Sequence, residues 1–225
     1  MHIGLIGGIG PSATISYYKR LIEEFRKADL PLKLTIEHAD MNVLLRNASK
    51  DQRTTQADVF AKHLETLAAA GCDIALITAL TGHFCFAETR GISPITLVDG
   101  TGIIDRYCHE NGIKTLGILG STSVLKTKLF GLLRVPEIVV PRAGLDELGA
   151  TYMELAQTGV CTPEQRSMFF EAGASMVKDQ HVEAVLLAGT DLGLAFDHQT
   201  PGFRVIDAVV LHVKVLVSLV ANEYL

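Results

Sequence analysis

The chain has 225 residues, of which 48% are hydrophobic and 20% are charged, and its formal net charge is −5. This length fits one large domain or two small, closely associated ones, and the apolar content excludes a disordered chain. Lys and Arg are not clustered and no segment is long and apolar enough to span a membrane, so we expect neither nucleic acid nor a membrane as a partner.

The N-terminus and the cysteines indicate the compartment. The first five residues have neither a basic region nor a small-residue cleavage site, and they read directly as a strand. No cysteine belongs to a C-x-x-C pair, so neither a zinc site nor a dithiol motif is indicated. The cysteines are Cys72, Cys85, Cys108 and Cys161. We therefore expect a cytoplasmic protein with reduced thiols.

Apolar runs and helical patterns alternate along the chain. Strands are predicted at 3–6, 32–36, 74–77 and 95–98, and helical spacing at 17–25, 57–70, 104–110 and 209–225. A polar loop is predicted after the second strand, around Arg46, Lys50 and Arg53. The last helix is rich in Val and Leu and is expected to return to the first half of the chain. Continuous apolar strands between helices predict an α/β fold with a mainly parallel sheet.

The second half repeats the first in outline. Gly4–Gly8 has a counterpart in Gly117–Ser121, and Asp73–Ile77 is echoed by Glu183–Leu187, at offsets of 113 and 110 residues. Any doubly wound sheet produces some similarity of this kind, but the common order and offset favour a duplicated unit. We predict two pseudosymmetric, doubly wound lobes, formed by 1–98 plus about 205–225 and by about 99–204.

Four junctions between a strand and a helix are candidate ligand sites, because ligands of open α/β sheets bind beyond the carboxyl ends of strands. Small residues and backbone N–H groups at a helix start favour an anion such as a carboxylate. The junctions are 7–12, 79–83, 120–123 and 189–191. The first also resembles a dinucleotide loop, but the acidic residue expected about 20 residues later is missing. Its glycines and Pro11 are equally consistent with a simple tight turn.

Five motifs, in order, resemble those of the aspartate/glutamate racemase superfamily, and they span nearly the whole chain. They are GLIGGIGPSAT at 4–14 for the family's G-L-I-G-G-M-G-P-x-A-T, ALTGH at 79–83 for C-N-T-x-H, GILGS at 117–121 for G-L-L-G-T, LAGTDL at 187–192 for L-G-C-T-E-L, and DAVVLH at 207–212 for D-x-x-x-x-H.

The resemblance implies an active site in the cleft between two lobes, a homodimer, and racemisation of an amino acid such as aspartate or glutamate. It implies no pyridoxal phosphate and no metal, because two opposed thiols move the α-proton. This sequence departs from the family at both thiol positions, which hold Ala79 and Gly189, and Leu80 replaces the family's Asn. A methyl group and a hydrogen cannot transfer protons, so two-thiol racemisation is not expected.

Other residues are candidates for the proton transfer that the two thiols perform in the family. His83 matches the family's His and either contacts a ligand or packs in the loop. Asp191 replaces the family's Glu and is either a buried base or an ordinary first-turn acid. We place these two in the catalytic set. Cys85 is a weaker candidate, since burial is a common fate for cysteine.

The expected substrate-binding residues come from the same junctions and one cation. Arg46 offers a bidentate partner for a distal carboxylate, with a solvated surface charge as the alternative. Thr81 and Thr190 either hydrogen-bond a carboxylate or cap their helices. Tyr152 and Gln157 lie in a region that lines family sites. The full expected binding set is Gly8, Ile9, Gly10, Arg46, Thr81, Ser121, Thr122 and Thr190.

Three functions remain open at this point. The first is a racemase-superfamily enzyme that acts on a small acid by altered chemistry, such as a lyase step. The second is an inactive relative that binds or senses a small amino acid or dicarboxylate. The third, a nucleotide-binding oxidoreductase, is disfavoured by the incomplete fingerprint.

Overall fold

The computed structural model describes residues 1–224, which form two compact units. The first unit consists of Met1–Gly100 and the chain from Val209 onward, and the second consists of Thr101–Ala208. The chain therefore crosses between the units twice, at Gly100 and at Ala208.

The sheet of the first unit is parallel and has the strand order β2-β1-β3-β4. The strands are β1 (Ile3–Gly7), β2 (Leu34–His38), β3 (Ile74–Ile77) and β4 (Thr96–Leu97). Ile3 of β1 lies opposite Leu34 on one side and Ile74 on the other. Every residue of β1 and β3 is buried, as expected for central strands covered on both faces.

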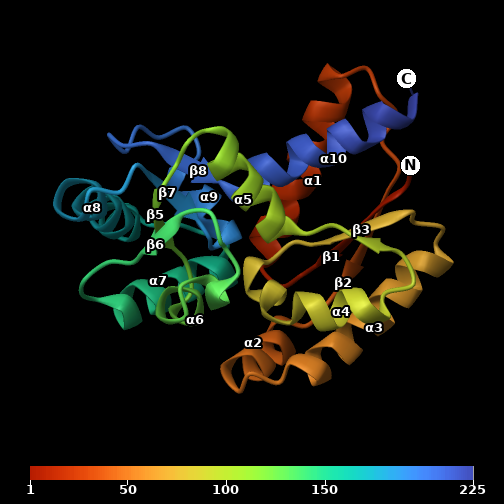
Figure 1. Cartoon of the computed structure of the whole chain (residues 1–225), viewed down its shortest axis with the longest axis horizontal. Coiled ribbons are helices and arrows are strands. Elements are labelled where there is room, and N and C mark those ends of the chain that lie inside the picture. Colours follow the sequence, from red (N-terminus) through yellow and green to blue (C-terminus); the bar gives the residue numbers. More distant parts are fainter. Residues whose placement is uncertain (225) are drawn as a thin grey trace. The chain divides into compact units, whose positions relative to one another are not determined.

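Helices cover both faces of this sheet (Figure 1). They are α1 (Pro11–Lys27), α2 (Met41–Ser49), α3 (Arg53–Ala69), α4 (Phe86–Ile92) and α10 (Ala208–Tyr224), with the 3-10 helix η1 (Leu80–Cys85). The core on one face joins Tyr17 of α1 and Val213 of α10 to the strands, so the last helix does return to the first unit. On the other face, Leu67 of α3 approaches the backbone at Gly4.

The polar loop predicted around Arg46, Lys50 and Arg53 is wrong, because this region is almost wholly helical in α2 and α3. The Asp40 side chain caps α2 by accepting a hydrogen bond from the Asn42 N–H at 2.7 Å. Asn47 then donates to Gln56 at 2.9 Å across the two helices, where both side chains are buried. This buried pair satisfies the hydrogen-bonding groups of two polar side chains, whose polarity had suggested a loop.

The second unit has the same topology, a parallel sheet ordered β6-β5-β7-β8. The strands are β5 (Thr115–Leu119), β6 (Glu137–Val139), β7 (Ala184–Leu187) and β8 (Val205–Asp207). Two equivalent parallel sheets confirm the predicted α/β class and its doubly wound, two-lobed architecture. The edge strands β6 and β8 are too short to leave a periodic signal in the sequence.

The helices of the second unit include a well-defined start at α8. They are α5 (Gly100–Glu110), α6 (Thr122–Lys126), η2 (Leu129–Gly131), α7 (Leu145–Thr158), α8 (Pro163–Gln180), η3 (Thr190–Leu192) and α9 (Gly193–Phe196). Thr162 and Gln165 form a reciprocal capping box before α8, with Pro163 as its first helical residue. Met176 of α8 packs close to Gly117 of β5.

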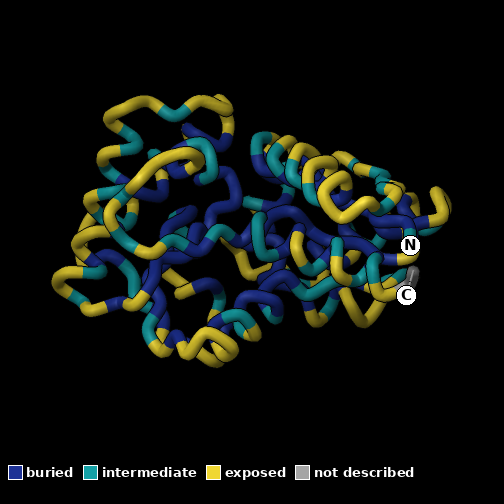
Figure 2. Tube along the Cα trace, turned by 90° about the horizontal axis from the view of Figure 1, so that it is seen from above, coloured by how far each residue is buried: buried dark blue, intermediate teal, exposed yellow. Residues whose placement is uncertain are grey.

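The distribution of burial follows this layered architecture. Figure 2 shows buried residues in the interior and exposed residues mainly on loops and outer helix surfaces. In the described part of the chain, no helix combines the length and apolarity needed to cross a lipid bilayer.

Candidate functional site

The carboxyl end of β3 leads directly into the candidate site of the first unit. Ala79 follows the strand by two residues and begins η1, whose Gly82 N–H donates to the Ala79 carbonyl at 3.0 Å. Ala79 itself is buried, and Thr81 is partly exposed. The only side-chain group that position 79 offers to this edge is therefore a methyl.

His83 is fully buried, and backbone groups occupy both of its ring nitrogens. The Gly100 N–H donates to Nε2 at 3.1 Å, so Nδ1 carries the proton and donates to the Ala79 carbonyl at 3.1 Å. Burial lowers the pKa of His83 and keeps the ring neutral. The geometry thus makes His83 a brace between the Ala79 loop and the Gly100 peptide.

A second buried histidine holds the same peptide from its other side. His212 Nε2 donates to the Gly100 carbonyl at 2.9 Å, and Tyr17 donates its hydroxyl to Nδ1 at 2.5 Å. Burial, followed by the neighbouring His83, lowers the pKa of His212 to about 3. A Cβ on Gly100 would lie 2.8 Å from atoms of both imidazoles, so this position requires glycine. We call Tyr17, His212, Gly100 and His83 the histidine clamp.

The β1 junction forms a tight turn before α1. Gly8 has a φ of 83°, and a Cβ there would lie 2.7 Å from the Ala39 carbonyl oxygen. Its N–H donates to the Thr14 hydroxyl at 2.9 Å, and that hydroxyl donates to the Gly10 carbonyl at 3.1 Å. Ile9 is buried. The Gly8 amide is therefore already used within the loop, which leaves the N-terminus of α1 as the anion-favouring feature here.

Arg46, the cation proposed for a distal carboxylate, lies on α2 and is exposed. Because α2 packs against η1, its side chain belongs to the same unit and the same neighbourhood as Thr81. Arg46 therefore adds a positive charge to the candidate site of the first unit.

The second unit brings its two junctions together. Gly189 follows β7 by two residues and begins η3, as Ala79 begins η1 after β3. A Cβ on Gly120, at the end of β5, would lie 2.9 Å from the Gly189 nitrogen. Ser121 caps α6 through the Val124 N–H at 3.4 Å, and Thr122 follows it. Thr190 and Asp191 are buried.

Tyr152 of α7 contacts two residues of the β7 junction, and the sequence did not predict these contacts. Its hydroxyl donates to the Asp191 carboxylate at 3.0 Å, and its ring lies against Gly189. Sequence spacing places Tyr152 on a helix but gives no sign of this partner. The glycine at position 189 was the one signal in the sequence, because a missing side chain leaves room for a large residue from another element.

The structure thus groups the predicted site residues by unit. The first unit holds Gly8, Ile9, Gly10, Arg46, Thr81 and His83, and the second holds Ser121, Thr122, Thr190 and Asp191. Among the side chains described, no group of three or more His, Cys, Asp or Glu residues has metal-binding geometry.

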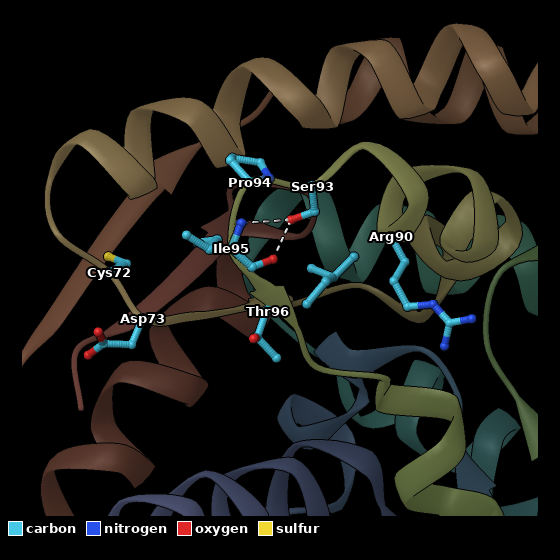
Figure 3. Close-up of a pocket in the computed structure, with 8 residues that line it drawn as sticks. Cys72, Asp73, Arg90, Ser93, Pro94, Ile95 and Thr96 are labelled. Carbon is cyan, nitrogen blue, oxygen red and sulfur yellow. Dashed lines mark hydrogen bonds between the residues drawn. The ribbon is translucent and has the colours of Figure 1, made fainter.

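A separate pocket of about 690 Å³ lies at the opposite edge of the first sheet (Figure 3). Its lining includes Asp73, directly before β3, and Ser93–Ile95, directly before β4. Ser93 donates its hydroxyl to the Ile95 carbonyl at 2.6 Å. Because these residues precede their strands, the pocket is at the amino edge and is distinct from the candidate site.

Cys85 is poorly suited to replace a catalytic thiol. It is fully buried, its Sγ lies 3.5 Å from the Thr89 hydroxyl, and burial raises its pKa to about 11. Burial likewise raises the pKa of Cys108 to about 11.

We expect iodoacetamide to alkylate the partly exposed Cys161 first in the folded protein at pH 8, and Cys85 only after unfolding. The reason is that the thiolate is the reactive species and needs access to the reagent. Peptide mapping by mass spectrometry measures the order, and Cys161→Ser serves as the control that removes the fast site. Equal labelling of Cys85 and Cys161 in the native protein would contradict the burial argument.

One family model and several solved structures match the chain. The sequence profile of the Asp/Glu/Hydantoin racemase family matches residues 6–216. The structure is similar to an aspartate racemase homologue from Pyrococcus horikoshii, with a TM-score of 0.79 and 21% identity over 98% of this chain and 99% of that one. A putative Asp/Glu racemase from Yersinia pestis has a TM-score of 0.76 and 19% identity over 98% and 100%. The aspartate racemase of Picrophilus torridus has a TM-score of 0.75 and 18% identity over 98% and 95%. A comparison with curated proteins found no match.

Proposed function

Because the chain belongs to the Asp/Glu/Hydantoin racemase family, we propose that it binds a small amino acid or dicarboxylate without carrying out two-thiol racemisation. The observation that carries the proposal is the equivalence of Ala79 and Gly189, which begin η1 and η3 two residues after β3 and β7. Neither side chain can move a proton.

Several groups support binding of a carboxylate at the strand ends. The N-terminus of α1, a helix of 17 residues, follows β1 at this edge and carries partial positive charge. Arg46 on α2 adds a full positive charge beside η1, and Thr81 adds a hydroxyl. A guanidinium paired with a carboxylate forms strong, charge-assisted hydrogen bonds.

Two versions of this function differ in turnover. An isomerase-family enzyme with altered chemistry would rely on Asp191, the buried carboxylate after Gly189. A binding protein without turnover is favoured by His83, because backbone groups occupy both of its ring nitrogens and leave it no proton-transfer role.

A thermal-shift titration tests ligand binding. We expect L-aspartate, D-aspartate, L-glutamate or D-glutamate at millimolar concentration to raise the melting temperature, since a ligand of the native state stabilises it by about 2.7 kcal/mol at 100 times its Kd. Arg46→Gln should weaken the effect, whereas Arg106→Gln, on α5 of the second unit, should not. No shift with any of these acids or with succinate would refute the proposal.

Deuterium exchange at the α-carbon in D₂O separates the two versions. We expect aspartate and glutamate of either configuration to exchange at the rate measured without protein. Exchange above that rate which Asp191→Asn abolishes, with the fold intact, would establish the enzyme version and reject simple binding.

A further inference from the structure

The pocket at the amino edge of the first sheet takes no part in the proposed function. Its volume of about 690 Å³ is within the range of small-molecule sites. Its lining consists of Cys72, Asp73, Arg90 and residues 93–97, all of which belong to the first unit (Figure 3). Neither Arg46 nor Thr81 is among them, so a ligand held here would not compete for the carboxyl edge.

Local hydrogen bonds fix the wall of this pocket where the chain enters β4. The Ser93 hydroxyl donates to the Ile95 carbonyl at 2.6 Å and accepts a hydrogen bond from the Ile95 N–H at 3.4 Å. Pro94 lies between these two residues, and its ring restricts the backbone further. This wall is therefore formed without a ligand, and binding requires no ordering of the turn.

Asp73 supplies a negative charge that the first strand holds in place. Its N–H donates to the His2 carbonyl at 2.8 Å, and its Oδ2 accepts a hydrogen bond from the His2 N–H at 2.5 Å. Within residues 1–224, no hydrogen bond uses its Oδ1, and the residue is exposed. This oxygen can therefore accept a hydrogen bond from a cationic group of a ligand.

Arg90 supplies a positive charge from the last turn of α4. Its guanidinium carbon lies 5.8 Å from the centre of the Phe86 ring, and no carboxylate in residues 1–224 forms an ion pair with it. Figure 3 shows Asp73 and Arg90 on opposite sides of Thr96. The pocket thus carries two separated charges of opposite sign, and neither is neutralised by the other.

These charges select a ligand that carries both signs at a distance from each other. A simple amine is attracted by Asp73 and repelled by Arg90, and the reverse holds for a simple carboxylate. Ile95 and Leu97 line the pocket as well and offer apolar contacts to methylene groups. We propose that the pocket is a second binding site, for an ω-amino acid whose ammonium group contacts Asp73 and whose carboxylate contacts Arg90.

Isothermal titration with ω-amino acids of increasing length tests the proposal. The probes are glycine, β-alanine, γ-aminobutyrate and ε-aminocaproate, with butylamine and butyrate as ligands of a single charge. We expect γ-aminobutyrate or ε-aminocaproate to bind at least about fivefold more tightly than glycine, butylamine or butyrate. The reason is that each of the last three reaches one charged end only, and about fivefold is the factor that one exposed ion pair supplies.

Two substitutions remove the charges one at a time. Asp73→Asn keeps an oxygen for the His2 N–H, and Arg90→Gln changes an exposed side chain, so the fold should persist in both. Each should weaken the preferred ω-amino acid by about fivefold. The matched controls are Asp58→Asn and Arg26→Gln, which alter exposed residues of the same unit outside the pocket and should leave the affinity unchanged.

Three results would overturn the proposal. They are no binding of any ω-amino acid, equal affinity for the longer ω-amino acids and butylamine or butyrate, and binding that Arg90→Gln leaves unchanged. If Asp73→Asn does not fold by circular dichroism, the Arg90→Gln result decides alone. Arg46→Gln should not alter the affinity for the ω-amino acid, so failure of this proposal leaves the proposed function at the carboxyl edge untouched.

Discussion

Acidification from pH 7 to pH 5 is expected to lower the free energy of unfolding by about 2 kcal/mol through His212 alone, and the lowered pKa of His83 acts in the same direction. Burial depresses the pKa of both histidines, that of His212 to about 3. Below pH 6.5 the unfolded chain therefore takes up protons that the folded chain does not. Stability is unaffected above that pH and falls as the pH decreases towards the folded-state values.

Urea unfolding at pH 7, 6 and 5 measures this dependence. His212→Gln keeps a donor for the Gly100 carbonyl but cannot titrate, so its loss of stability over this range should be smaller than that of the wild type by about 2 kcal/mol. His109→Gln, the same replacement at an exposed histidine, is the matched control. A His212→Gln variant with the wild-type pH dependence would show that the pKa of His212 is not lowered in the folded protein.

Gly149→Ala is expected to destabilise the protein by about 3 kcal/mol, because the new methyl group would overlap the backbone of Thr122. A backbone segment at a helix start cannot rotate away as a flexible side chain can. Helix α7 would have to move away from α6, and Tyr152 would move with it. Denaturant unfolding measures the loss.

Gly91→Ala is the matched control for this substitution. Gly91 also lies in a helix, α4, but a Cβ there would meet no atom within 4 Å. Its replacement should leave stability unchanged or raise it by up to about 1 kcal/mol through helix propensity. Equal effects of the two substitutions on the free energy of unfolding would contradict the predicted overlap between position 149 and Thr122.

Local patterns in the sequence predicted the elements that depend on local periodicity. The bounds of β3 at Ile74–Ile77 agree with the apolar run, and the return of the last helix follows from its Val and Leu content. The helix α2 was missed because it has only nine residues and its buried face mixes Leu44 and Ala48 with Asn47, whose partner Gln56 lies on the next helix.

The sequence by itself determined the α/β class, the repeated topology and the family. These follow from apolar periodicity and from motifs whose residues are close together in the chain. Only the tertiary structure decided that His83 braces Gly100 and that Tyr152 fills the space at Gly189. Tyr17 and His212 are 195 positions apart, and Tyr152 and Asp191 are 39 apart. A buried polar group takes whichever partner the packed helices and strands bring within reach, and such partners are fixed by long-range packing and not by spacing along the chain.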